Sequence, residues 1–147
     1  LFLLELAGAL ARAQRPLTVL SPADGPLAAA FRSLGARVEV LDPLGLPAPA
    51  SPRAARAAVA AAARACGPGP VSLVVGNTIA AWWAVPLARA LGCPSFLQVH
   101  ESCPPDRFFL GSVGPAIYRR IAGAFSEASH VSFLTDSTRA YFRHLLG

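Results

Sequence analysis

The sequence predicts an α/β fold, a Rossmann-like doubly wound parallel sheet. Two short apolar runs, Val71–Val75 and Ser95–Val99, are separated by a segment of helical character, Ile79–Leu91. Apolar runs that are bounded by turn residues and separated by a helix are typical of buried parallel strands in a βαβ unit. Strand-like and helix-like segments also alternate along the rest of the chain, which is the order of elements in a doubly wound sheet.

The first elements follow the same alternation. Leu1–Ala13 carries apolar residues at helical spacing and predicts a helix. Leu17–Leu20 predicts a strand that runs into a turn rich in proline and glycine. Leu27–Leu34 predicts a helix that stops at Gly35, because glycine is the usual residue just beyond a helix end. Arg37–Leu41 predicts the next strand.

The remaining segments complete the pattern. The proline-rich stretch Asp42–Pro52 predicts a loop, and the alanine- and arginine-rich stretch Arg53–Cys66 predicts a helix that Gly67–Pro70 interrupts. After the central βαβ unit the chain predicts a loop at Glu101–Gly114, a helix at Ile117–Ala128, a strand at Val131–Leu134 and a helix at Ser137–Leu146.

Length and composition are those of one globular domain over residues 1–147, since 54% of the residues are hydrophobic and 14% are charged. The chain opens inside a predicted helix, with no strand and no glycine-rich turn before it. In Rossmann-like sheets that first strand is central. We therefore expect a fragment of a longer two-domain protein that lacks its first strand. The alternative is a smaller sheet that is complete as given.

The charge of the chain limits the classes of binding partner, and its cysteine content indicates the cellular compartment. The net charge is +5 and all 13 basic residues are arginine, but these are scattered, whereas a nucleic-acid footprint gathers on one face. We expect no nucleic-acid partner, and a peripheral contact with an anionic inner membrane face stays open. The three cysteines form no CxxC pair, which favours a reducing cytoplasm over a disulfide framework.

Polar residues follow the two central strands. Gly76-Asn77-Thr78 comes after the first run and His100-Glu101-Ser102 comes after the second. In open α/β sheets, ligands bind beyond the carboxyl ends of the strands. His100 is the candidate catalytic residue, because an imidazole there can hydrogen-bond a sugar hydroxyl or a phosphate, or move a proton. The alternative is a histidine that only ends the strand or packs on Phe108.

The neighbours of His100 are candidate acceptor- or substrate-binding residues. Glu101 can orient His100 or accept a hydrogen bond from a substrate hydroxyl. Because adjacent strand residues point to opposite faces, it can also face solvent or a helix. Ser102 either binds a hydroxyl or starts the loop. Thr78 suits the N-cap of the next helix, which explains its identity without a ligand, and the role of Asn77 is more open.

A pair of tryptophans and a group of possible metal ligands also occur in the sequence. The adjacent Trp82 and Trp83 either pack in the core or offer one indole to a sugar or a lipid. The spacing of His100, Cys103 and Asp106 matches no standard zinc arrangement, so no metal site is expected. No Walker loop and no G-x-S-x-G elbow occurs in the sequence.

The chain resembles the N-terminal, acceptor-side half of GT-B glycosyltransferases, and family 4 in particular. The closest likeness runs from Val75-Gly76-Asn77-Thr78 through Gly92-Cys93-Pro94 to His100-Glu101-Ser102, which is similar to the block of bacterial polysaccharide glycosyltransferases that ends in HES. The pattern around Leu34-Gly35-Ala36-Arg37-Val38 and the stretch Phe133–Arg139 also resemble that half. The resemblance covers nearly the whole chain.

The resemblance implies a function that involves a second domain. The intact enzyme would transfer a sugar from a nucleotide-sugar donor to a glycan or lipid-linked acceptor in polysaccharide biosynthesis, with no further cofactor. The C-terminal domain of such enzymes binds most of the donor, so this chain alone is expected to be inactive. The rival interpretations are a non-catalytic module that binds a nucleotide or small ligand, and a purely structural fragment.

Overall fold

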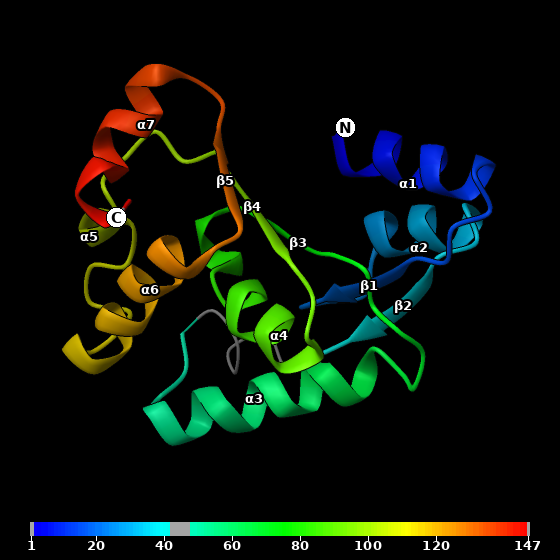
Figure 1. Ribbon diagram of the computed structural model, residues 1–147, viewed down its shortest axis with the longest axis horizontal. Coiled ribbons are helices and arrows are strands. Elements are labelled where there is room, and N and C mark those ends of the chain that lie inside the picture. Colours follow the sequence, from blue (N-terminus) through cyan, green and yellow to red (C-terminus); the bar gives the residue numbers. More distant parts are fainter. Residues whose placement is uncertain (1, 42–47, 147) are drawn as a thin grey trace. The chain divides into compact units, whose positions relative to one another are not determined.

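Two compact units make up the chain, residues 1–43 and residues 44–147, and each is described by itself. The structure is a computed structural model that describes residues 2–41 and 48–146 (Figure 1). Every strand pair in the described part is parallel, so the predicted α/β class is confirmed. The strands lie in two sheets, one of two strands in the first unit and one of three strands in the second.

The first unit follows the predicted order of elements to within about a residue. Its strands pair in register from Thr18 opposite Arg37 to Ser21 opposite Val40. Gly35, at φ 83°, follows the helix end in the left-handed conformation that glycine adopts without a steric penalty. The elements are α1 (Phe2–Arg12), β1 (Thr18–Ser21), α2 (Pro26–Ser33) and β2 (Arg37–Val40).

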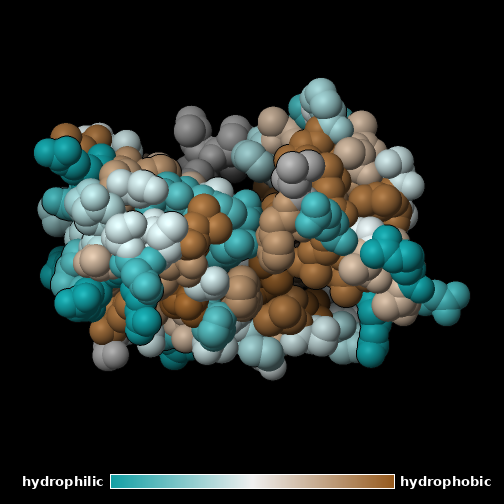
Figure 2. All heavy atoms as spheres, turned by 90° about the horizontal axis from the view of Figure 1, so that it is seen from above, coloured by the Kyte–Doolittle hydropathy of each residue, from teal (hydrophilic) through white to brown (hydrophobic). Residues whose placement is uncertain are grey.

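The core of the first unit is small. Ala7, Phe31 and Ala36 are buried, and partly buried leucines and valines pack around them. Other apolar residues reach the surface, among them Phe2 and Leu27. Figure 2 shows apolar side chains exposed on the right of the view, the side on which α1 and α2 lie in Figure 1.

The second unit contains the predicted βαβ unit. Its sheet has the strand order β3-β4-β5, and the register sets Asn77 opposite Gln98 and Gln98 opposite Ser132. The strands are β3 (Val74–Asn77), β4 (Ser95–Val99) and β5 (His130–Phe133). The α-helices are α3 (Pro52–Ala65), α4 (Ala84–Leu91), α5 (Pro105–Phe108), α6 (Pro115–Glu127) and α7 (Asp136–Phe142), with the 3₁₀ helices η1 (Ile79–Ala81) and η2 (Arg143–Leu145).

The predicted strand at Val71–Val75 is wrong in its bounds. The strand begins at Val74 and extends through Gly76 and Asn77, which follow the predicted apolar run in the sequence. The reason is the partner strand: β4 provides ladder positions for Val74 through Asn77, opposite Ser95 through Gln98. Asn77 is therefore the last residue of the strand.

The predicted continuous helix at Ile79–Leu91 is also wrong. It is two elements, the 3₁₀ helix η1 and the helix α4, with Trp82 and Trp83 between them. The cause is Pro86, which in one long helix would clash with the carbonyl of Trp82. In the observed arrangement Pro86 lies in the first turn of α4, where its missing N–H leaves no hydrogen bond unmade.

Three smaller differences concern loops and a helix end. The predicted loop at Glu101–Gly114 contains the short helix α5, which starts at Pro105 because proline suits a first helical position. The final predicted helix ends at Phe142 and continues as η2. Within the predicted loop Asp42–Pro52, residues 42–47 lie outside the described residues, and Pro52 begins α3 behind the capping Ser51.

The core of the second unit lies on one face of its sheet. Leu97 and Val99 of β4 are fully buried there, together with apolar residues of the helices. Gly76 lies on this face at a very close approach: a Cβ at this position would come within 2.9 Å of the Ala81 carbonyl oxygen, Ala84 Cβ and Leu97 Cδ1. Glycine is thus required for β3 to pack beneath η1 and α4.

Two serines join the start of β4 to the start of β5. The Ser95 backbone N–H donates to Ser129 Oγ, and the Ser129 backbone N–H donates to Ser95 Oγ, each over 3.1 Å. We expect Ser95→Ala to cost about 1 kcal/mol of unfolding free energy, because it leaves a backbone donor without its partner. Chemical denaturation measures this cost. The exposed Ser126→Ala on α6 is the control, and equal stability of the two variants would contradict the role of the serine pair.

Candidate functional site

His100 and Asn77 meet at the carboxyl edge of the three-stranded sheet. Asn77 ends β3 and His100 follows β4 directly. His100 Nε2 lies 2.6 Å from Asn77 Oδ1, a short hydrogen bond between residues 23 positions apart in the chain. Both side chains are half-buried, so the imidazole is held by the protein and still reachable from solvent. The structure thus brings together one residue from each predicted polar cluster.

Glu101 contacts the backbone of both clusters. Its Oε2 accepts a hydrogen bond from the Ile79 N–H over 2.9 Å and another from the His100 N–H over 3.1 Å. The first of these bonds satisfies a donor at the start of η1, which has no partner within the helix. Glu101 therefore links the end of β4 to the segment that follows β3.

Thr78 forms the turn between β3 and η1. Its N–H donates to the Gln98 carbonyl over 2.8 Å, and its Oγ1 accepts from the Ala80 N–H over 3.1 Å, so the predicted capping role is confirmed, here for a 3₁₀ helix. Thr78 has φ 93° and ψ 158°, a region that glycine alone adopts readily. A β-branched residue in this conformation stores strain of about 1–3 kcal/mol, which the surrounding hydrogen bonds hold in place.

The other residues weighed from the sequence fall outside this cluster. Ser102 is exposed at the start of the loop. Trp82 is fully buried in the core, and Trp83 is partly buried and packs against the same core. The ring of Phe108 makes an edge contact with Phe109 at 4.9 Å. The two tryptophans thus take the core role that the sequence analysis weighed against a ligand role.

Gln98 lies beside the site, and the sequence analysis overlooks it. It stands opposite Asn77 in the ladder and two residues before His100, and its Oε1 is buried without a hydrogen-bond partner. An unpaired buried acceptor is uncommon in folded proteins. The signal was present in the sequence, because Gln98 is the one amide side chain in the run Ser95–Val99.

Among residues 2–41 and 48–146, no three histidine, cysteine or acidic side chains gather in a way that could hold a metal ion. Cys66, Cys93 and Cys103, which all lie in the described residues, form no disulfide. Burial raises the pKa of the Cys93 thiol, which keeps it protonated and a weak nucleophile near neutral pH.

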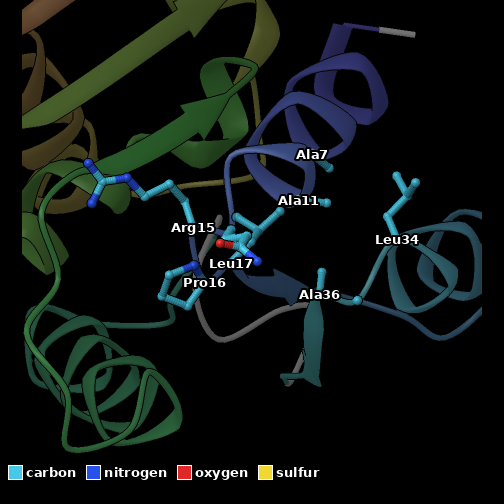
Figure 3. Close-up of a pocket in the computed structure, with 9 residues that line it drawn as sticks. Ala7, Ala11, Arg15, Pro16, Leu17, Leu34 and Ala36 are labelled. Atoms are coloured by element: carbon cyan, nitrogen blue, oxygen red, sulfur yellow. The ribbon is translucent and has the colours of Figure 1, made fainter.

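A cavity of about 300 Å³ lies in the first unit. Ala7 and Ala11 of α1 line it together with Leu17, Leu34 and Ala36 (Figure 3). Leu17 and Ala36 directly precede β1 and β2, so the cavity lies at the amino ends of these strands. Ligands of open α/β sheets bind at the opposite edge, and the cavity contains none of the predicted site residues.

The chemistry available at the site is hydrogen bonding and proton movement by one imidazole. Asn77 fixes the ring, Glu101 fixes the backbone that carries it, and the strained Thr78 holds the neighbouring turn. Such pre-set geometry allows a side chain to act on a bound group without reorganising first. Among the residues that the structure describes, the hydrogen-bond partner of the ring is the Asn77 amide, which is neither an acid nor a base.

Comparisons with known proteins point to one family. A family model described as "Glycosyl transferase 4-like domain" matches residues 2–147. No curated protein and no solved structure shows a significant match to the chain. The matched range includes both polar clusters and every described helix and strand.

Proposed function

Because the chain belongs to the family of glycosyl transferase 4-like domains, we propose that it forms the acceptor-side half of an enzyme that moves a sugar from a nucleotide-sugar donor to a glycan or lipid-linked acceptor. The observation that carries the proposal is the hydrogen bond between His100 and Asn77 at the carboxyl edge of β3 and β4. In a glycosyltransferase domain, this edge is where a substrate is expected.

His100 takes the catalytic role in this proposal. Glycosyl transfer passes through a transition state in which positive charge builds on the sugar and negative charge builds on the leaving phosphate. A fixed imidazole contributes by hydrogen bonding to a hydroxyl or to the phosphate where that charge develops. We assign most of the donor contacts to a second domain, since this site provides one such group.

A lipid-linked acceptor is favoured by the surface beyond the site. Helix α5 and the turn after it expose Phe108 and Leu110, with exposed fractions of 39% and 81%, next to the exposed Arg107. Exposed apolar side chains suit a lipid surface, and the charge of Arg107 is offset by that of the neighbouring exposed Asp106. In the described residues, no helix is long and apolar enough to cross a membrane. We therefore propose a peripheral contact at the cytoplasmic membrane face.

The test is sugar transfer by the protein at its natural length. Nucleotide sugars with labelled sugars are incubated with the protein and with either lipid extract or water-soluble glycans. We expect label to enter the lipid fraction, and label in the soluble glycans would instead identify a glycan acceptor. If the protein binds nucleotide sugars and passes no label to either fraction, the rival interpretation as a binding module replaces this one.

A further inference from the structure

The hydrogen bond between Asn77 and His100 determines which ring nitrogen holds a proton. An amide oxygen has lone pairs and no hydrogen, so Asn77 Oδ1 is the acceptor and His100 Nε2 is the donor over their 2.6 Å separation. The neutral ring therefore carries its proton on Nε2. Its lone pair is then on Nδ1, because a neutral imidazole has one protonated and one unprotonated nitrogen.

The backbone of His100 is fixed independently of its ring. Glu101 Oε2 accepts from the His100 N–H and from the Ile79 N–H, so a single carboxylate oxygen joins the end of β4 to the start of η1. Hydrogen bonds to a charged acceptor are stronger than those between neutral groups. This pair of bonds keeps His100 at a constant position relative to Asn77, which lies two residues before Ile79.

We propose that Asn77 and Glu101 are positioning residues that present His100 to the substrate through Nδ1, and this inference rests on the proposed function. Asn77 selects the tautomer and Glu101 holds the backbone. A nitrogen with a free lone pair accepts hydrogen bonds. The group recognised at Nδ1 is therefore a hydroxyl of the sugar or acceptor, and not an unprotonated phosphate oxygen, which has no hydrogen to donate.

This inference changes the roles expected from the sequence for two residues. Asn77 and Glu101 were candidates for direct contact with the acceptor. One polar atom of each side chain already has a partner in the structure: Asn77 Oδ1 contacts the ring, and Glu101 Oε2 contacts two backbone donors. Both residues would then influence transfer through His100.

Nitrogen NMR of histidine-labelled protein at natural length tests the tautomer directly. Protonated and unprotonated ring nitrogens resonate far apart, and the His100 signals are assigned by their loss in His100→Ala. We expect the neutral ring to be protonated at Nε2 and unprotonated at Nδ1. A free neutral histidine already favours Nε2–H, so Asn77→Ala should lower the fraction of this tautomer towards the free-imidazole value. Asn77→Asp should keep the wild-type fraction, because a carboxylate still accepts from Nε2. Ser132→Ala, at the same level of the sheet, is the control.

Transfer kinetics test the positioning role of Glu101. Glu101→Ala should lower kcat at least tenfold with little change in the donor KM, because the donor still binds and the ring is misplaced. Glu101→Gln should restore most of kcat, since the amide oxygen can accept from the same two donors. A change in donor KM with constant kcat would instead indicate direct substrate contact and overturn the role.

The outcomes separate this inference from the proposed function. A wild-type ring with its proton on Nδ1, or tautomer populations in Asn77→Ala equal to those of the wild type, overturns the inference while transfer activity stands. If His100→Ala transfers sugar as well as wild type, the catalytic role of His100 fails, and with it the inference about substrate contact. The expected tautomer together with loss of kcat in Asn77→Ala supports both.

Discussion

His100→Ala is expected to lower kcat for sugar transfer by about 10²- to 10⁴-fold, the usual contribution of a side chain that assists by hydrogen bonding or proton transfer. The fold should survive, because His100 is half-buried at a strand end and its side chain contributes one hydrogen bond, with Asn77. Loss of a single such bond costs about 1 kcal/mol. Activity should thus fall far more than stability does.

The measurement is steady-state transfer alongside thermal unfolding of the same preparation. His144→Ala is the matched control, because that histidine is exposed in η2 at the C-terminal end of the chain. The control should retain full activity. A large drop in the melting temperature of His100→Ala, in proportion to its lost activity, would show a structural histidine and not a catalytic one.

Gly76→Ala is expected to give the largest loss of stability. The added methyl group would come within 2.9 Å of a backbone oxygen, a Cβ and a leucine methyl. The first two of these atoms cannot move away by a change of side-chain rotamer. Overpacking of this kind costs about 1–3 kcal/mol. In a chain of this size, each kcal/mol lowers the melting temperature by about 2–4 °C.

Thermal unfolding followed by circular dichroism checks this effect. Gly69→Ala is the control, because a Cβ at Gly69 meets no atom within 4 Å and the backbone there is not left-handed. That variant should melt within about a degree of wild type. Equal melting temperatures for the two variants would mean that β3 does not lie as close to η1 and α4 as described.

The sequence predicts the elements better than it predicts their ends. Strand β4 has the bounds Ser95–Val99 that its apolar run indicates, because alternate residues of it are buried in the core. The bounds of β3 depend on pairing with β4, which no local pattern contains. The division of the segment 79–91 was readable, since Pro86 cannot occupy the interior of a helix, but the strong helical propensity of its neighbours hides that signal.

For the site too, the sequence predicts the location of the residues but not their hydrogen bonds. The parallel βαβ pattern of the sequence predicts that Asn77 and His100 lie at the same carboxyl edge of the sheet. The pairing of Asn77 Oδ1 with Nε2 depends on the register of two strands, and the bonds of Glu101 depend on where η1 begins. The positive φ of Thr78 has no sequence signal, because threonine is a poor choice for that conformation.

The central claim is that substrates meet this chain at the carboxyl edge of β3 and β4. The most direct test is to follow the NMR chemical shifts of the backbone amides. The protein at its natural length is titrated first with a nucleotide sugar and then with an acceptor. We predict that the largest changes in this chain fall at residues 76–79 and 99–102. Changes confined to the residues around the cavity of the first unit, with the amides of Thr78 and His100 unmoved, would contradict the claim.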